Sequence, residues 1–273
     1  MRVEVLVATM NQNDYSLFEK MNIQSDVVFA NQADKDSISS TVINGHQVRM
    51  ITTPTKGVGL NRNIALLSSE ADILIYADDD EVLSDGYVET VIEAFTRLPD
   101  ADIIAFGLSY TKNGEVFKTK RENTKRRRLY NGLGYGAVRL AIKRDSYLRS
   151  NIMFSQLFGG GCVYCAGEDT VYLMNAFRQK LRIYSYPYVL CSTNKDSSSW
   201  FVGYDEKYFY DDGASIAAAF GRLYWLFAIY HAIKKDFKSN MNCLEKIKAI
   251  FAGIKGYEKT RSYNEWKNNN SNE

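Results

Sequence analysis

The sequence predicts an α/β fold with a mostly parallel sheet, and three observations support this prediction. Short apolar runs rich in β-branched residues alternate with segments of helical spacing through the first 110 residues. Polar residues directly follow several of these runs, as they do at the carboxyl ends of parallel strands. The 273 residues are 45% hydrophobic and 24% charged, which excludes a disordered or fibrous chain.

Each predicted element has its own local signal. The strands are runs of strand length bounded by polar or turn residues: 2–8, 26–30, 40–43, 47–52, 72–77, 102–108 and 182–191. The helices have apolar residues at helical spacing or acidic residues in the first turn: 57–69, 85–97, 168–180 and 213–235. Asn44-Gly45 is a strong hairpin signal between two of the strands. Residues 111–128 have no clear period, and alternation returns at 135–142.

Charge is unevenly distributed, although the net charge is only +2. Residues 1–111 carry 7 basic and 17 acidic side chains, and residues 112–128 carry 8 and 2. Residues 231–273 carry 9 basic and 5 acidic side chains. An acidic first half that needs a cation, and basic patches in a loop and a tail, indicate different partners for different faces.

The sequence favours a cytoplasmic location. It contains no run of about eighteen uncharged apolar residues, so a transmembrane helix is not expected. Its start lacks the apolar core and cleavage site of a secretory signal. Four cysteines do not make a disulfide framework in a chain of this size. Cys162 and Cys165 lack a second pair at zinc-ligand spacing, so we expect them to be small buried hydrophobic residues.

Three consecutive aspartates, Asp78-Asp79-Asp80, directly follow the predicted strand 72–77. Carboxylates this close repel one another unless they share a cation. Hard carboxylate oxygens suit Mg²⁺ or Mn²⁺, which retain waters and engage a substrate diphosphate. The sequence therefore indicates a metal site at this strand end, and a solvated acidic loop is the alternative.

Two further segments begin predicted helices. The run 57–63, Gly-Val-Gly-Leu-Asn-Arg-Asn, offers close backbone approach, free N–H groups and the phosphate-matching fork of Arg62. Gly167 precedes Glu168 and Asp169, and a carboxylate here could take the proton from an attacking hydroxyl group. Ordinary capping of a helix by acidic residues is the alternative for the second segment.

Together these segments resemble the family 2 glycosyltransferases of the glycosyltransferase-A fold, especially bacterial enzymes of capsule and O-antigen assembly. The likeness spans about residues 2–215, in matching order and spacing. It rests on VEVLVAT in the first strand, G-x-G-x-x-R-N at 57–63, ILIYADDDE at 73–81 and GEDTVYL at 167–173.

The resemblance implies an inverting, metal-dependent enzyme that moves a hexose from a nucleotide diphosphate sugar, a UDP-sugar in the simplest case, to a saccharide hydroxyl. The implied acceptor is a growing oligosaccharide linked to a lipid diphosphate, at the cytoplasmic face of the plasma membrane. Nucleic acid is not an expected partner, peripheral contact with the membrane is, and the oligomeric state is left open.

The resemblance also assigns roles to individual residues. Asp80, with Asp78 of the same D-x-D pattern, would hold Mn²⁺ or Mg²⁺ on the donor diphosphate. Asp169 would be the general base, and Glu168 would orient the acceptor or share that role. The nucleotide-sugar pocket would be lined by Thr9, Asn11, Gln32, Asp34, Gly57, Arg62, Asp78 and Asp79. The acceptor would contact Gly160, Gly161 and Trp200.

Two departures from the family pattern are visible. Many relatives have a histidine downstream of the Glu-Asp pair that completes the metal shell, whereas residues 187–199 contain none. The third ligand would then be Cys191, Asn194, Asp196 or only water. The loop 31–34, Asn-Gln-Ala-Asp, stands where relatives often have an acidic, serine-rich loop.

The expected organisation follows from the resemblance. Residues 1–110 would bind the nucleotide sugar and residues 111–212 the acceptor, with the catalytic base in the second part. Residues 213–267 would form C-terminal helices, and 268–273 a disordered tail. The basic run 118–128 is either a solvated loop or a contact for an anionic acceptor or membrane. The aromatic segment 214–233 either lies at a membrane interface or packs as a helix.

Two other functions are considered. A nucleotidyltransferase would use a similar sheet and paired acids, but it usually has a phosphate loop with glycine and lysine after the first strand. Residues 9–13 contain neither. A non-catalytic saccharide-binding protein with a relic site is the second alternative, and the intact Asp and Glu-Asp motifs argue against it.

Overall fold

The computed structural model describes residues 1–194, 203–234 and 239–270, which group into two compact units. The first unit comprises Met1–Lys56, Leu60–Phe154 and the described part of Leu173–Ser198. The second comprises Gly57–Gly59, Ser155–Tyr172 and the described part of Ser199–Glu273. Two of the boundaries between the units fall within helices, namely α2 (Val58–Leu67) and α6 (Glu168–Arg178). The division at residues 110, 212 and 267 stays a prediction.

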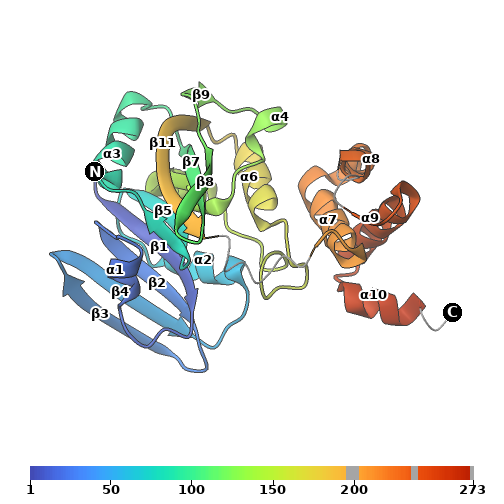
Figure 1. The fold of residues 1–273 in the computed structure, drawn as a ribbon, viewed down its shortest axis with the longest axis horizontal. Helices are drawn as coiled ribbons and strands as arrows, with labels where there is room; N and C mark the ends of the chain where they lie inside the picture. The colour runs from blue at the N-terminus through green and yellow to red at the C-terminus, as the bar shows by residue number, and fades with distance from the viewer. Residues whose placement is uncertain (195–202, 235–238, 271–273) are drawn as a thin grey trace. The chain divides into compact units, whose positions relative to one another are not determined.

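The first unit is built on a mixed sheet of eleven strands (Figure 1). In chain order they are β1 (Val3–Met10), β2 (Asp26–Gln32), β3 (Ser37–Ile43), β4 (His46–Thr53), β5 (Ile73–Asp78), β6 (Glu81–Leu83), β7 (Ile103–Lys112), β8 (Glu115–Lys120), β9 (Lys125–Arg126), β10 (Leu140–Lys143) and β11 (Ile183–Asn194). The order along the sheet is β3-β4-β2-β1-β5-β10-β7-β11-β6, with β8 on β7 and β9 on β11. Strands β4, β2, β1 and β5 are parallel, and β10 runs antiparallel between β5 and β7. The predicted α/β class is confirmed, with a sheet that is parallel over four strands and mixed beyond them.

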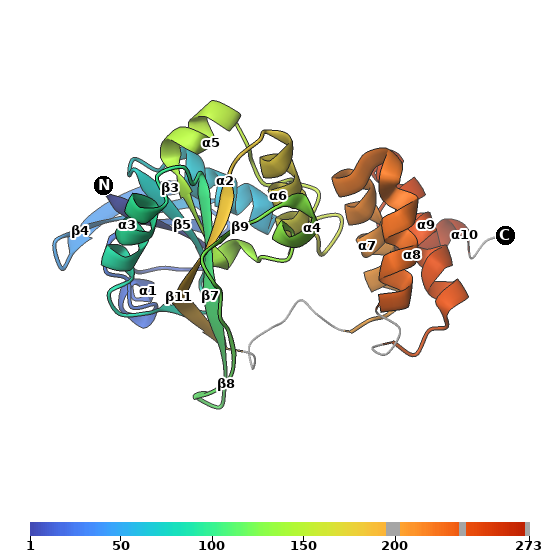
Figure 2. The ribbon, with the colours of Figure 1, turned by 90° about the horizontal axis from the view of Figure 1, so that it is seen from above.

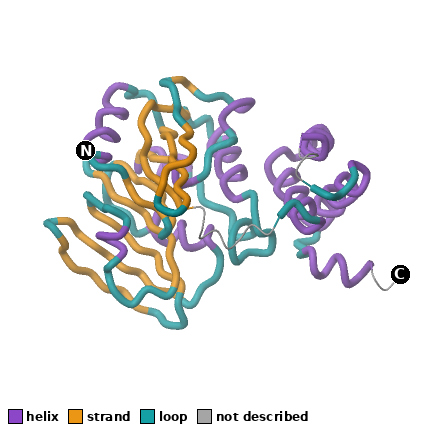
Figure 3. The backbone as a smooth tube through the Cα atoms, viewed as in Figure 1, coloured by secondary structure: helices purple, strands orange, loops and turns teal. Residues whose placement is uncertain are grey.

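The helices complete the two units (purple in Figure 3). The remaining helices of the first unit are α1 (Leu17–Lys20), α3 (Tyr87–Arg97), α4 (Leu129–Gly132) and α5 (Arg144–Ser150), with a 3₁₀ turn at Ala137–Arg139. Those of the second unit are α7 (Glu206–Phe220), α8 (Tyr224–Lys234), α9 (Cys243–Glu258) and α10 (Tyr263–Asn270). Helices α7, α8 and α9 pack side by side (Figure 2). A Cβ atom on Gly213 of α7 would lie 2.0 Å from the carbonyl oxygen of Ile250, so this glycine lets α7 approach α9.

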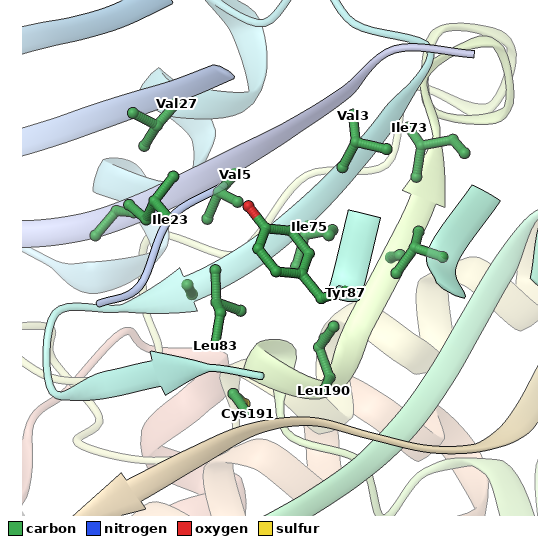
Figure 4. Close-up of a cluster of buried hydrophobic side chains, with 14 of the residues drawn as sticks. Val3, Val5, Ile23, Val27, Ile73, Ile75, Leu83, Tyr87, Leu190 and Cys191 are labelled. Atoms are coloured by element: carbon green, nitrogen blue, oxygen red, sulfur yellow. The ribbon is translucent and has the colours of Figure 1, made fainter. Parts of the chain in front are cut away.

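The core of the first unit holds the parallel strands in place. Every residue of β1 from Val3 to Thr9 is buried, as expected for a strand covered on both faces. Figure 4 shows the ring of Tyr87, from α3, beside Val5 and Ile75. Burial of each such side chain stabilises the fold by roughly 1.5–3 kcal/mol. The Tyr87 hydroxyl contacts Ser25 Oγ at 2.8 Å, and burial raises the pKa of Tyr87 to about 12.

The basic stretch 111–128 is more regular than its sequence predicted. Strand β7 continues to Lys112, the chain turns at Asn113-Gly114, and β8 returns antiparallel to β7. Asn113 and Gly114 have φ angles of 51° and 80°, as Asn44 and Gly45 do at 51° and 83° in the predicted hairpin. The turn signal was therefore present, but β8 is largely exposed and shows no apolar alternation. The sequence of β8 shows no hydrophobic period because neither face of this strand is buried.

The predicted helix 213–235 is two helices. Helix α7 ends at Phe220, and Gly221 has a φ of 50° and a ψ of −127° before a 3₁₀ turn leads into α8. Among the described residues, the run Glu206–Ile233 is the one stretch long and apolar enough to cross a membrane, by length and composition alone. This finding differs from the expectation that no segment qualifies. Helix α10 continues to Asn270, so residues 268–270 of the predicted disordered tail are helical.

Candidate active site

The parallel strands bring the predicted nucleotide-binding residues to one edge of the first unit. Thr9 of β1 pairs in register with Asn31 of β2. The backbone N–H of Asn11 donates to the carbonyl oxygen of Gln32 at 2.8 Å, so the ends of β1 and β2 are joined. Asp34 is exposed beyond the end of β2. Thr9, Asn11 and Gln32 thus lie together, as the carboxyl ends of parallel strands require.

The three aspartates begin with Asp78, the last residue of β5, which pairs with β1, and each makes different contacts. Nη2 of Arg62 donates to both carboxylate oxygens of Asp78, at 2.8 and 2.9 Å. Oγ1 of Thr9 donates to Asp79 Oδ2 at 2.6 Å. Asp80 is exposed at the surface. The first carboxylate is therefore anchored to α2 and the second to β1, while the third lies toward solvent.

Asp80 lies beside two carboxylates of the same charge, Asp78 and Asp79. Neighbouring protein atoms remove part of the hydration of its carboxylate, and Asp78 and Asp79 carry the same charge; both effects raise its pKa. A hydrogen bond with Thr193 at the end of β11 acts in the opposite direction. A bound cation would remove the repulsion, and donor diphosphate and water could complete its shell. Asp78 fits a direct ligand less well, because Arg62 occupies both of its oxygens.

Two side chains of helix α2, Asn61 and Arg62, form hydrogen bonds with this edge of the sheet. Arg62 is 3% exposed, and its Cζ lies 5.2 Å from the ring centroid of Phe154. The guanidinium that was predicted to face the base or diphosphate here binds Asp78. Nδ2 of Asn61 donates to the carbonyl oxygens of Thr9 at 3.0 Å and Ala30 at 2.7 Å. Sequence reasoning gave Asn61 no role, yet it ties the ends of β1 and β2 to α2.

Two more residues of this edge were not assigned a role from the sequence. Glu81 is 3% exposed and accepts the backbone N–H of Asp78 at 3.2 Å. Burial, and then the charge of Asp78, raise the pKa of Glu81 well above its ordinary value. Asn31 is fully buried; its Nδ2 donates to the carbonyl oxygen of Gln12 at 3.0 Å and to Thr52 Oγ1 at 3.1 Å. The available signal was a polar residue at the end of an apolar strand, which needs partners once it is buried.

In the second unit, glycines bring three predicted residues together. Gly57 has a φ of 111°, and a Cβ atom there would lie 2.8 Å from Sγ of Cys162. The N–H of Val58 donates to the carbonyl oxygen of Gly160 at 3.0 Å. A Cβ atom on Gly161 would lie 3.3 Å from the nitrogen of Gly57. The start of α2 and the loop with the predicted acceptor glycines are therefore in contact.

The predicted catalytic acids lie in the first turn of α6, also in the second unit. Glu168 and Asp169 are both half-buried. Gly167 before them has a φ of 108°, and a Cβ atom there would lie 2.4 Å from Cβ of Ser215. A Cβ atom on Gly159 would lie 3.2 Å from Cδ of Glu168, so the Glu168 side chain packs on the glycine loop. Trp200, the predicted acceptor contact, lies outside the described residues.

The third metal ligand is not supplied by Cys191. Its thiol is fully buried and points at the carbonyl oxygen of Val138, 3.5 Å away. Burial raises the pKa of Cys191 well above its ordinary value, which disfavours the thiolate that binds metals. Asp196 lies outside the described residues. In the described part of the chain, no group of three or more His, Cys, Asp or Glu side chains is arranged to hold a metal ion.

Cys165 is not the apolar residue that its sequence predicted. Its Sγ donates to Asp211 Oδ2 at 2.8 Å, and Nζ of Lys207 lies 2.5 Å from the same oxygen. Burial raises the pKa of Cys165, so the protonated thiol serves as the donor. This contact fixes the loop before α6 onto α7 within the second unit.

Solved structures with the same fold come from S. aureus TarS. The structure of TarS 1–349 in complex with UDP-GlcNAc matches with a TM-score of 0.57 and 14% identity, over 96% of this chain and 93% of that chain. The complex with UDP gives a TM-score of 0.55 at 14% identity and the same coverage. A longer TarS structure gives 0.52 at 16% identity, over 97% of this chain and 44% of that one. At these identities the likeness establishes the fold alone.

A search of the curated proteins found no match. The family model for glycosyl transferase family 2 matches residues 3–155, which is more than half of the chain. The matched region contains β1, the glycine-rich start of α2 and the aspartates after β5. The glycosyltransferase-A fold expected from the sequence agrees with the TarS likeness. The chain belongs to glycosyl transferase family 2.

Proposed function

We propose that the protein is an inverting, metal-dependent hexosyltransferase that uses a UDP-sugar and a saccharide acceptor. The observation that carries the proposal is the carboxylate cluster after β5, where Asp80 lies beside two like charges. Membership of family 2 supports glycosyl transfer. The TarS structures hold UDP-GlcNAc and UDP, which supports a uridine nucleotide as donor.

The donor nucleotide is assigned to the edge formed by β1, β2 and β5. Thr9, Asn11 and Gln32 would line the base and ribose, with Asp34 at the outer rim. Gly57 would allow close approach of the backbone to the donor. Because Asn61 and Asn31 fix the ends of these strands before any ligand arrives, little ordering would be needed on binding.

Asp80 is the proposed ligand of Mn²⁺ or Mg²⁺, and Asp78 would contribute through water. When bound, the cation neutralises the charge that develops on the departing diphosphate. Arg62 donates hydrogen bonds to Asp78, and Thr9 donates one to Asp79. Both contacts keep two negative charges oriented beside Asp80, which favours cation binding there.

Asp169 is the proposed general base. Its carboxylate would take the proton from the acceptor hydroxyl while the oxygen forms a bond to the anomeric carbon. The bond from that carbon to the diphosphate breaks, and the diphosphate leaves with the electron pair. Attack from the face opposite the leaving group inverts the anomeric centre. Such assistance is worth about 10²–10⁴-fold in rate, and Glu168 would orient the acceptor.

The proposed acceptor is an oligosaccharide linked to a lipid diphosphate, reached from the cytoplasmic face of the plasma membrane. Helix α8 supports peripheral contact with that membrane. Its exposed face carries large apolar side chains at helical spacing: Trp225, Leu226, Ile229, Tyr230 and Ile233. Their exposed fractions of 42–60% are what an amphipathic helix at a lipid interface presents. The acceptor sugar would contact Gly160, Gly161 and Trp200.

A panel of nucleotide sugars tests the donor assignment. Thermal unfolding is measured with each nucleotide sugar, with and without Mn²⁺, because a ligand that binds only the folded state raises the melting temperature. We expect a UDP-sugar with Mn²⁺ to give the largest shift and to be hydrolysed slowly. Shifts that are identical without metal would contradict the cation assignment.

The same reagents separate the rival functions. A nucleotidyltransferase would release inorganic diphosphate from UTP and a sugar 1-phosphate, and we expect no such release. A non-catalytic saccharide-binding protein would bind the donor without ever hydrolysing it or transferring its sugar. Release of UDP from a UDP-sugar in the presence of Mn²⁺ is the outcome that supports the glycosyltransferase.

A further inference from the structure

The first unit has a pocket of about 380 Å³ between the β9–α4 segment and the later turns of α6. Nine residues line it, and none of these is acidic. Five of the nine are cationic: Arg126, Arg127, Arg128, Arg178 and Lys180. The proposed transfer reaction gives this pocket no role.

The backbone around the pocket is fixed by hydrogen bonds and close packing. Strand β9 pairs with β11, where Arg126 lies opposite Tyr184. The N–H of Arg127 donates to the carbonyl oxygen of Ile183 at 2.7 Å. A Cβ atom on Gly132 would lie 2.5 Å from the ring of Phe177, so α4 packs directly on α6. The pocket is therefore preformed, unlike a solvated basic loop.

The cations of the pocket divide into two kinds. Arg127 is half-buried and committed, because it pairs with Glu122 at 2.6 Å and donates to Ser185 Oγ at 2.9 Å. Arg126, Arg128 and Lys180 are exposed. Within the described residues these three make no ion pair. Several positive charges thus converge on one cavity whose nine lining residues include no acid.

The rest of the lining is apolar. Leu129, Met174, Phe177 and Leu181 complete the pocket. Guanidinium groups match phosphate oxygens bidentately, and an apolar wall suits a hydrocarbon chain. A ligand that satisfies both has a phosphate or diphosphate group attached to a hydrocarbon. A nucleic acid or an acidic peptide would leave the apolar wall without a partner.

The pocket is separate from the donor edge. Strand β9 pairs with β11 at Tyr184 and Ser185, near its start. The contact of β11 with Asp80 comes from Thr193, near its other end. At about 3.3 Å per residue these points are roughly 25–30 Å apart. One site therefore cannot be part of the other.

We propose that this pocket binds the phosphoryl head of an amphiphile, with the phosphate or diphosphate among Arg126, Arg128 and Lys180 and the first carbons of the chain against Leu129 and Phe177. The inference stands independently of the transfer reaction, because it rests on the lining and charge of a second cavity. It gives the basic run of the sequence a ligand of defined chemistry.

Isothermal titration of the full chain tests the proposal with three probes: farnesyl diphosphate, inorganic diphosphate and farnesol. We expect farnesyl diphosphate to bind most tightly, inorganic diphosphate about tenfold more weakly, and farnesol not measurably. Equal affinities for the two diphosphates would overturn the amphiphile assignment. Failure of farnesyl diphosphate to bind would overturn the site altogether.

Matched variants locate the binding. Arg128→Ala and Lys180→Ala are each expected to weaken farnesyl diphosphate about tenfold, since each removes a charge-assisted hydrogen bond. Arg121→Ala removes the same charge from the same basic run, but Arg121 does not line the pocket, so the affinity should hold within about twofold. Equal losses in all three variants would show diffuse attraction and overturn the site. UDP binding, measured on every variant, should be unchanged and reports an intact fold.

A vesicle assay identifies the source of the phosphoryl group. Flotation is compared for phosphatidylcholine vesicles with and without phosphatidic acid. If the natural ligand is a headgroup in a bilayer, phosphatidic acid recruits the full chain, and Arg128→Ala reduces this recruitment while Arg121→Ala does not. If the natural ligand is a single amphiphile outside a bilayer, farnesyl diphosphate binds in the titration, but vesicles that contain phosphatidic acid do not recruit the full chain. Recruitment that ignores Arg128 would contradict the use of this pocket by bilayers.

Discussion

The two ends of the sheet in the first unit provide opposite surroundings for their carboxylates. Asp102 precedes β7 and is 5% exposed, so burial by itself would raise its pKa. It accepts hydrogen bonds from the N–H of Arg182, Oγ of Ser146 and Nη2 of Arg149, each at 2.7 Å. These donors outweigh burial and hold the pKa of Asp102 below its ordinary value.

At the carboxyl end of β5, burial and like charges outweigh the hydrogen bonds that would lower the pKa values of the carboxyl groups. Asp80 and Glu81 both lose hydration and lie beside Asp78, and their pKa values are raised. A fold that surrounds Asp102 with donors leaves like charges together here. The structure satisfies the charge of Asp102 with its own donors and leaves like charges together at the end of β5, which is where the proposed cation would act.

The strongest test of this contrast is Asp80→Ala. Removing the proposed ligand should reduce Mn²⁺-dependent release of UDP from a UDP-sugar by about 10³-fold, because a bound cation contributes several kcal/mol to charge stabilisation. Steady-state hydrolysis with and without Mn²⁺ measures the effect. Asp36→Ala, which removes an exposed acid with no proposed role, serves as the control and should retain most of the metal dependence. Full metal-dependent turnover in Asp80→Ala would reject the assignment.

Asp169→Asn tests the proposed catalytic base of the second unit, and the measured quantity is the rate of sugar transfer to an acceptor. Loss of the general base should lower transfer to acceptor by about 10²–10⁴-fold, while the melting-temperature shift caused by UDP and Mn²⁺ is kept. The neighbouring variant Glu168→Gln should have a smaller effect if it only orients the acceptor. Unchanged transfer by Asp169→Asn would move the base elsewhere.

At the acidic end of the sheet, the features that could be predicted were those set by neighbouring residues in the sequence. Asp78, Asp79 and Asp80 follow a continuous apolar run, so a strand that ends in an acidic loop was predictable. The positions of Thr9 and Gln32 followed from the rule that ligands lie at the carboxyl ends of parallel strands. These features require no knowledge of which side chains meet.

The partners of these residues could not be foreseen, because they come from distant parts of the chain. Asn61 reaches Thr9 across 52 positions, and Arg62 binds Asp78 across 16. Strand β6, which carries Glu81, is three residues long and is defined by its pairing with β11. The break at Gly221 was hidden because apolar residues continue on both sides of it. Such contacts depend on tertiary packing, which the hydrophobic periodicity of a single segment does not reveal.

Asp102→Asn tests the satisfied end of the sheet. A lowered pKa means that ionised Asp102 stabilises the fold above the unfolded value near 4, and that this contribution is lost as the pH falls through the lower folded value. The variant should lose about 2–3 kcal/mol in free energy of unfolding at pH 7 and much less near pH 3. Urea unfolding at the two pH values measures this. Asp100→Asn, an exposed neighbour 3.2 Å from Arg182, should change stability by under about 0.5 kcal/mol.

The smallest expected effect concerns Arg62, which donates to both carboxylate oxygens of Asp78. Arg62→Met removes a buried cation from Asp78, whose side chain is 35% exposed, so solvent compensates part of the loss. We expect the free energy of unfolding to fall by about 1–2 kcal/mol in urea. Arg97→Met removes the exposed pair with Glu93 and should stay within about 0.5 kcal/mol. Because Arg62 also holds Asp78 beside Asp80, Mn²⁺ with UDP should stabilise Arg62→Met less than it stabilises the wild type. If the ligands stabilise both proteins equally, Arg62 does not prepare the carboxylates for a cation, and the contrast between the two ends of the sheet loses its functional meaning.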